Sequence, residues 1–167
     1  MTDPAPGTTA AWVIEALVAR GQTLAVAESL TGGLLAATIV DVPGASRAFR
    51  GGLVVYATDL KTSLAGVPAD LLATAGPVHP ATAAALALGA RTRCAADWGL
   101  ATTGVAGPDP QDGVAVGTVY VAVSTAVADG RDSVRSLSLS GSRAQIRVRT
   151  VAAALDLLAT ALATSRS

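Results

Sequence analysis

The sequence predicts an α/β protein with three layers, in which helices flank a mixed, partly antiparallel sheet. Two observations support this fold class. Short runs rich in valine, leucine and alanine alternate with longer stretches that have helical spacing, which favours strands between helices. The last two apolar runs are joined by a tight turn at residues 128–131 instead of a helix, so the later strands should be antiparallel.

The composition indicates one globular domain. The 167 residues are enough for one domain, which we expect over residues 8–165 after a flexible leader of residues 1–7. Twelve basic and twelve acidic residues favour neither a nucleic-acid partner nor a membrane surface. No apolar stretch reaches the ~20 residues of a membrane span, and the N-terminus lacks the basic start of a signal peptide. We therefore expect a cytoplasmic protein.

The first helix and strand open the domain. A helix that begins at Thr8 or Thr9 should end at Gly21, with Trp12 as an anchor in the core. The apolar run at residues 23–27 should form a short buried strand.

The other elements follow in order, each bounded by glycine, proline or a capping residue. Further helices are expected at about residues 34–40, 67–75, 81–96 and 142–162, the last with a buried stripe of Ile146, Val151, Leu155 and Leu158. Further strands are expected at residues 53–56, 98–103, 117–123 and 133–139.

Two loops that follow buried strands are candidates for ligand binding. Free backbone N–H groups at a strand-to-helix turn and at a glycine-rich loop suit a phosphate or a carboxylate. The alternative for the first turn is simple helix capping, and for Glu28 a capping or ion-pair role is the preferred interpretation. The candidate substrate-binding residues are Glu28, Ser29, Thr31, Gly32 and Gly33 in the first turn, and Thr103, Gly104, Ala106 and Gly107 in the second loop.

Lys61 is the only lysine of the chain, which suggests a specific role. A lysine amine can lose its proton when it is partly desolvated and can then act as a base. Ser46 could approach Lys61 and Tyr56 only if the chain reversed direction, and the glycine pair at residues 51–52 permits such a reversal. We therefore predict that Ser46, Tyr56 and Lys61 are catalytic; the alternative is a capping serine, a strand tyrosine and a solvated lysine.

The remaining reactive residues favour structural roles. With one cysteine, Cys94, and one histidine, His79, the chain can form no internal disulfide and no ordinary structural zinc site. Cys94 is expected to be a small buried side chain, and His79 a structural residue at a helix start. We predict no metal and no organic cofactor.

Five motifs in series resemble those of the CinA C-terminal-domain family, over about residues 8–162. They lie at residues 27–33, 42–46, 51–61, 103–108 and 143–147. The resemblance implies an amidohydrolase that converts nicotinamide mononucleotide and water to nicotinate mononucleotide and ammonia. It also implies a serine, lysine and tyrosine trio, whose motif positions fall on Ser46, Lys61 and Tyr56.

Relatives often carry a second, N-terminal domain. This sequence predicts one domain only, so we expect it to be a stand-alone form. Its partners should be a nucleotide substrate and, given its apolar and weakly charged composition, a second copy in a homodimer. The chain differs from many relatives at positions expected to affect substrate affinity, namely Leu30, Ser142, His79-Pro80 and residues 110–113. Two alternatives are a catalytically silent nucleotide-binding or regulatory protein and a hydrolase of another amide.

Overall fold

The structure is a computed structural model that describes residues 6–165. Its helices are α1 (Pro6–Arg20), α2 (Leu34–Val40), α3 (Thr58–Ser63), α4 (Ala69–Ala75), α5 (Pro80–Arg93) and α6 (Arg143–Thr164), with a short 3-10 helix, η1 (Ala45–Arg47). Its strands are β1 (Leu24–Glu28), β2 (Phe49–Val54), β3 (Trp98–Gly104), β4 (Thr118–Thr125) and β5 (Ser133–Ser138).

The five strands form one mixed sheet in the order β2-β1-β3-β4-β5. β1 pairs in parallel with both β2 and β3, whereas β4 pairs antiparallel with β3 and with β5. The change of direction follows from the connections, because helices join the parallel strands, whereas a loop at residues 105–117 joins β3 to β4 and a turn joins β4 to β5. The mixed, partly antiparallel sheet that the sequence predicts is confirmed.

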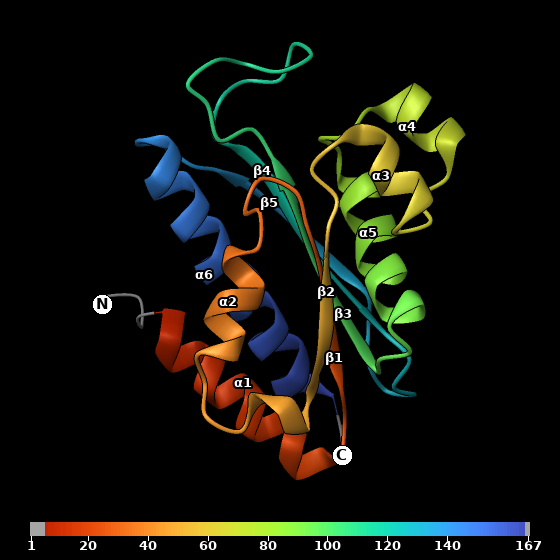
Figure 1. The fold of residues 1–167 in the computed structure, drawn as a ribbon, viewed down its shortest axis with the longest axis vertical. Coiled ribbons are helices and arrows are strands. Elements are labelled where there is room, and N and C mark those ends of the chain that lie inside the picture. Colours follow the sequence, from red (N-terminus) through yellow and green to blue (C-terminus); the bar gives the residue numbers. More distant parts are fainter. Residues whose placement is uncertain (1–5, 166–167) are drawn as a thin grey trace.

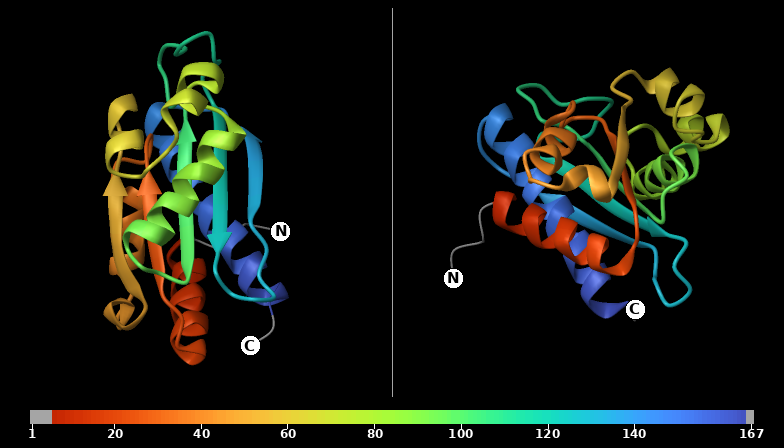
Figure 2. Two further views of the ribbon diagram at one scale, coloured as in Figure 1. Left: turned by 90° about the vertical axis from the view of Figure 1, so that its right-hand side faces the viewer. Right: turned by 60° about the horizontal axis from the view of Figure 1, so that its bottom comes forward.

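Helices cover both faces of the sheet, as Figures 1 and 2 show. On one face, larger side chains such as Val26 and Leu100 pack with α1, α2 and α6. On the other face the strands present alanines, such as Ala25 and Ala101, to α5. A Cβ on Gly99 would collide with the backbone of α5, so small residues let this helix approach the sheet closely.

The N-terminal helix differs from its prediction in two ways. It begins at Pro6, two residues before Thr8, because proline suits the first turn, where no backbone N–H is needed. Trp12 is 43% exposed, so its assignment as a core anchor is wrong; Val13 and Leu17 supply the buried contacts instead. Residues 1–5 of the expected leader lie outside the described part of the chain.

The terminal helix agrees with its prediction. Ser142 caps α6 by accepting a hydrogen bond from the Gln145 backbone N–H, and the Gln145 side chain accepts one from the Ser142 N–H in return. The predicted stripe of Ile146, Val151, Leu155 and Leu158 is buried.

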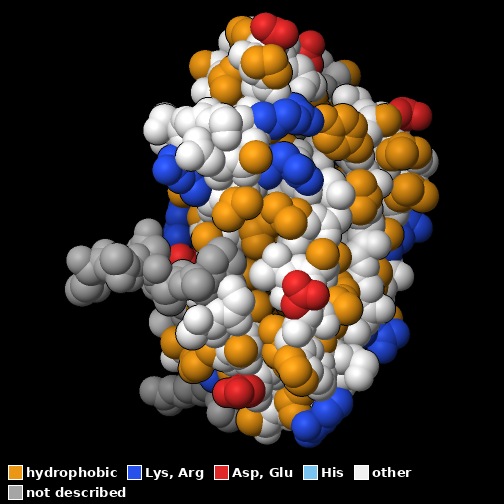
Figure 3. Space-filling view, turned by 60° about the vertical axis from the view of Figure 1, so that its left-hand side comes forward, with side chains coloured by type: hydrophobic (Ala, Val, Ile, Leu, Met, Phe, Trp, Pro, Cys, Tyr) orange, Lys and Arg blue, Asp and Glu red, His pale blue; other side chains and the backbone are white. Residues whose placement is uncertain are grey.

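The surface combines apolar and charged areas. Exposed large apolar side chains include Trp12, Val40 and Val148, and Figure 3 shows apolar atoms scattered over one face among few acidic groups. Within residues 6–165, no helix is both long enough and apolar enough to cross a membrane. The homodimer stays a prediction.

Candidate active site

The ends of the three parallel strands converge at one edge of the sheet. β1 lies between β2 and β3, and the helices that follow β1 and precede β3, α2 and α5, pack on opposite faces. At such a switch point the loops at the carboxyl ends of the strands separate and leave a crevice. Ser29 follows β1, Tyr56 follows β2 and Val105 follows β3, so the fold brings these three segments together.

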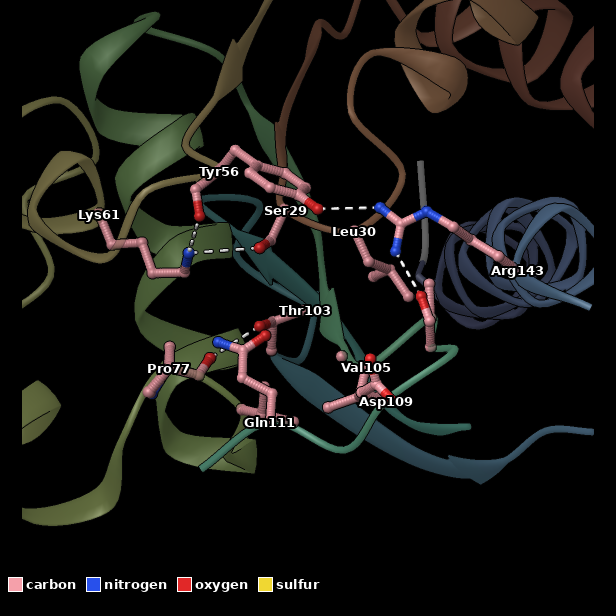
Figure 4. A pocket seen from close by; sticks show the side chains of 14 residues that line it. Ser29, Leu30, Tyr56, Lys61, Pro77, Thr103, Val105, Asp109, Gln111 and Arg143 are labelled. Atoms are coloured by element: carbon pink, nitrogen blue, oxygen red, sulfur yellow. Dashed lines mark hydrogen bonds between the residues drawn. The ribbon is translucent and has the colours of Figure 1, made fainter. Parts of the chain in front are cut away.

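A pocket occupies this crevice, and Figure 4 shows it from close by. Its lining combines a buried lysine, hydroxyl groups, backbone from the loop after β3 and one arginine from α6. The lining residues that matter for the chemistry are Ser29, Tyr56, Lys61, Thr103, Gly104, Ala106, Gly107, Asp109, Gln111 and Arg143.

Lys61 lies at the closed end of the pocket, with only 1% of its surface exposed. Its Nζ lies 3.2 Å from Ser29 Oγ and donates to the Val55 carbonyl oxygen at 2.7 Å and, more weakly, to that of Tyr56 at 3.3 Å. Carbonyl oxygens only accept hydrogen bonds, so a neutral Lys61 amine would give its two N–H groups to them. Its lone pair would then face the Ser29 hydroxyl.

Burial also changes the acidity of this lysine. Desolvation lowers the pKa of Lys61 from 10.5 to about 8, because the charged form loses contact with water while the neutral form loses little. A substantial fraction of the side chain is therefore neutral near pH 8. The predicted alternative of a solvated Lys61 is wrong.

Ser46 does not join Lys61, so the predicted Ser46–Lys61 pairing is wrong. Ser46 is exposed in η1, before β2 begins, whereas Lys61 follows the end of that strand. The six residues of β2 span about 20 Å at the rise of an extended strand. The chain does not reverse at residues 51–52. Gly52 is a strand residue, and its missing side chain leaves room for Val26 of β1 and Ala36 of α2.

The turn after β1 serves mainly as a scaffold for Ser29. The buried Glu28 carboxylate accepts hydrogen bonds from the backbone N–H groups of Leu35 (2.8 Å) and Ala36 (3.1 Å), at the start of α2. The Thr31 hydroxyl bonds to that of Thr102 at 2.8 Å. Of the five predicted residues in this turn only Ser29 lines the pocket, so the structure supports capping over substrate contact for Glu28.

The two glycines of the turn have backbone roles. Gly32 and Gly33 both adopt positive φ angles, of 55° and 99°, which a side chain would strain. Arg147 from α6 donates to the carbonyl oxygens of Leu30 at 2.9 Å and Thr31 at 2.7 Å. These contacts hold the turn that carries Ser29, and neither glycine lines the pocket.

The end of β3 and the loop that follows it line the pocket as predicted. Thr103, Gly104, Ala106 and Gly107 all contribute to its wall. The Thr103 hydroxyl donates to the Pro77 carbonyl oxygen at 2.7 Å, which ties the end of β3 to the segment before α5. Substrate binding by these residues stays a prediction.

Tyr56 reaches the pocket in an unexpected way. Its carbonyl oxygen contacts Lys61, while its phenol oxygen accepts a hydrogen bond from Arg143 Nη2 at 2.9 Å, as Figure 4 shows. The sequence alone did not single out Arg143, Asp109 or Gln111 as site residues. Arg143 lies 87 residues from Tyr56 in the sequence, and the contact of its guanidinium with Gly107 in the loop after β3 helps to bring the two together.

The single histidine has a structural position. His79 precedes α5, and its Nδ1 accepts a hydrogen bond from the Ala81 backbone N–H at 3.1 Å, which caps the helix. Cys94 is half-buried at the end of the same helix. Residues 6–165 contain no group of three or more histidine, cysteine or acidic side chains arranged to hold a metal ion.

Comparison of the sequence with known proteins reveals its relatives. A family model of the CinA C-terminal domain matches residues 7–162. The chain is 54% identical over 151 residues to a CinA-like protein of Frankia casuarinae, covering 90% of this chain and 34% of that protein. It is 45% identical over 147 residues to a CinA-like protein of Acidobacterium capsulatum, covering 87% and 35%. The chain thus spans about a third of the length of these curated relatives.

Solved structures agree with the sequence comparison. The competence damage-inducible protein A of Klebsiella pneumoniae superposes with a TM-score of 0.90 at 30% identity, covering 96% of this chain and 98% of that one. The competence/damage inducible protein CihA of Agrobacterium tumefaciens superposes with a TM-score of 0.89 at 32% identity, covering 98% of each chain. With the family model and the strand arrangement, these matches show that the chain belongs to the CinA C-terminal-domain family.

Proposed function

We propose that this protein is an amidohydrolase that deamidates nicotinamide mononucleotide, with Ser29 as the nucleophile and Lys61 as its base. One observation carries the proposal: a buried lysine with a lowered pKa lies 3.2 Å from a serine hydroxyl inside a pocket. A nucleophile within hydrogen-bond reach of its base is the arrangement that covalent amide hydrolysis requires.

The reaction can be written with these two side chains as its acid, base and nucleophile. Neutral Lys61 takes the Ser29 hydroxyl proton while Oγ attacks the carboxamide carbon. The resulting Lys61 ammonium then gives that proton to the departing nitrogen, which leaves as ammonia, and Ser29 carries the acyl ester. Lys61 next takes a proton from a water molecule that attacks the ester, and returns it to Ser29 Oγ as nicotinate mononucleotide leaves.

The substrate follows from the family resemblance, and the pocket is compatible with it. The closed end holds the catalytic pair, and the loop from Thr103 to Gly107 offers backbone along one wall. Arg143 lies at the exposed end. A mononucleotide carries a carboxamide at one end and a phosphate at the other, which matches a pocket with a base at one end and a guanidinium at the other.

The test is ammonia release from nicotinamide mononucleotide by the purified chain, with nicotinate mononucleotide quantified in parallel. We expect equal amounts of both products from the wild type and a loss of at least about a thousandfold in Lys61→Met, which has no base. Circular dichroism should show that both proteins are folded. A folded wild type that binds the mononucleotide without releasing ammonia would refute the enzyme proposal and favour a nucleotide-binding role.

A further inference from the structure

Arg143 is a cation at the rim of the pocket that the chemistry at Ser29 does not use. It occupies the first position of α6 and is exposed, whereas Lys61 is buried at the other end. Its Nη1 donates to the Gly107 carbonyl oxygen at 2.6 Å, and its Nη2 donates to the Tyr56 phenol oxygen at 2.9 Å. These two bonds hold the guanidinium at the rim, as Figure 4 shows.

Neither of these partners neutralises the charge of Arg143. A carbonyl and a phenol are uncharged acceptors, and the hydrogen bonds of the described residues give Arg143 no carboxylate partner. A guanidinium has five N–H donors, so three remain for a ligand. Asp109 lies in the same lining and opposes an anion, so its removal should strengthen anion binding beside Arg143.

Tyr56 fixes the spacing between the two ends of the pocket. Its carbonyl oxygen accepts from Lys61 and its phenol oxygen accepts from Arg143, so the catalytic lysine and the guanidinium lie one tyrosine apart. A ligand that engages both must carry its amide and its anion at a similar separation. A mononucleotide carries these two groups at its opposite ends, whereas a nucleoside has the amide and no anion.

We propose that Arg143 is the specificity-determining residue that binds the phosphate monoester of the substrate and so selects nucleotides over nucleosides. The inference rests on the proposed amidohydrolase function and assigns one end of that substrate to one side chain. Guanidinium groups bind phosphate through paired, charge-assisted hydrogen bonds, which supports arginine at this position.

The experiment compares nicotinamide mononucleotide with nicotinamide riboside, which lacks only the phosphate. In the Arg143→Gln variant, the ratio of kcat/KM for the mononucleotide to that for the riboside should fall about ten- to a hundredfold from its wild-type value. In Asp109→Asn, which removes the opposing charge, the same ratio should rise. If Arg143 had a purely structural role, through Tyr56 or Gly107, the substitution would lower kcat/KM equally for the two compounds. The ratio would then stay unchanged, and this result would overturn the inference.

A binding arm separates this inference from the proposed reaction. Calorimetry on Ser29→Ala, with and without Arg143→Gln, measures the affinity for each compound without turnover. A preference for the mononucleotide that depends on Arg143 supports the inference even if the wild type releases no ammonia, a result that would refute only the reaction. If Ser29→Ala bound the two compounds with equal affinity, the inference would be overturned, whereas the proposed amidase reaction would be unaffected.

Discussion

At the scale of single residues, the site depends on the environment of one lysine. Three oxygen atoms surround Lys61 Nζ, and none of them carries a formal charge. Burial without a carboxylate partner penalises the ammonium form, which is the physical cause of its lowered pKa. The same buried position places the amine beside the Ser29 hydroxyl. Lys61 therefore has both the lowered pKa of a base and a neighbouring group from which it can take a proton.

The lowered pKa predicts a pH dependence of activity. The base must be neutral, so kcat/KM for nicotinamide mononucleotide should rise about tenfold per pH unit below pH 8 and level off above it. Initial rates of ammonia release between pH 6 and pH 9.5 would measure this. Circular dichroism at each pH controls for unfolding. A profile that is flat, or that falls between pH 7 and pH 9, would contradict a base role for Lys61.

At the scale of elements, a buried carboxylate determines where α2 begins. Gly33 precedes this helix and offers no side-chain cap, so the Glu28 carboxylate from the preceding strand accepts the second and third N–H groups of the helix instead. A carboxylate at this end also interacts favourably with the helix dipole. The turn that carries Ser29 is therefore anchored on both sides, by Glu28 beneath α2 and by Arg147 from α6.

This anchoring predicts a loss of stability in Glu28→Gln. The amide keeps one acceptor but turns an NH2 group toward a backbone N–H, so the free energy of unfolding should fall by about 1–3 kcal/mol. Urea denaturation would measure the change. Glu15→Gln is the matched control, because Glu15 is the other glutamate and is exposed on α1, where a change should stay within about 0.5 kcal/mol. Equal effects of the two substitutions would contradict the capping role.

A second prediction at this scale concerns the contact between β2 and its neighbours. A Cβ at residue 52 would lie 2.8 Å from Val26 Cγ2 and 3.5 Å from Ala36 Cβ. Gly52→Ala should therefore lower the free energy of unfolding by about 1–3 kcal/mol, since Val26 is fully buried and stiff.

The control for this substitution is Gly7→Ala. Gly7 lies in α1, and no atom lies within 4 Å of the place that an alanine methyl group would occupy there. Alanine at this position should therefore be neutral or stabilise the helix by up to about 1 kcal/mol. Thermal and urea unfolding of both variants would provide the comparison. If Gly52→Ala had wild-type stability, residue 52 would not pack closely against Val26. That result would contradict its place in the sheet and favour the chain reversal that the sequence suggested.

At the scale of the whole molecule, local patterns predicted the fold well. The boundaries of α2 agree with the prediction, and those of β3 and α6 differ by one or two residues, because apolar spacing, capping residues and glycines act over a few neighbours. The helix α1 was predicted, but the exposure of Trp12 was not, because both sides of the helix carry apolar residues. Which side faces the core depends on where α6 packs.

The site was only partly predictable, because local patterns do not determine which distant segments pack together. Lys61 was selected because it is the only lysine, and the segment from Thr103 to Gly107 because it is rich in glycine at the end of a buried strand; both line the pocket. Ser46 was selected as the nucleophile because the glycine pair at residues 51–52 was interpreted as a reversal, whereas Gly52 lies in the sheet and permits close packing. Ser29 could have been selected from the rule that ligands bind at the carboxyl ends of parallel strands. Arg143 depends on a contact 87 residues away in sequence.

The two serines provide the most direct measurement of the central claim, that Ser29 and Lys61 form the active site. Ammonia release from nicotinamide mononucleotide should be compared between Ser29→Ala and Ser46→Ala. The two changes are identical, but Ser29 follows the end of β1, whereas Ser46 precedes the start of the neighbouring strand β2. We predict that Ser29→Ala loses at least about a thousandfold in kcat and that Ser46→Ala stays within about twofold of the wild type. An inactive, folded Ser46→Ala beside an active Ser29→Ala would contradict the account.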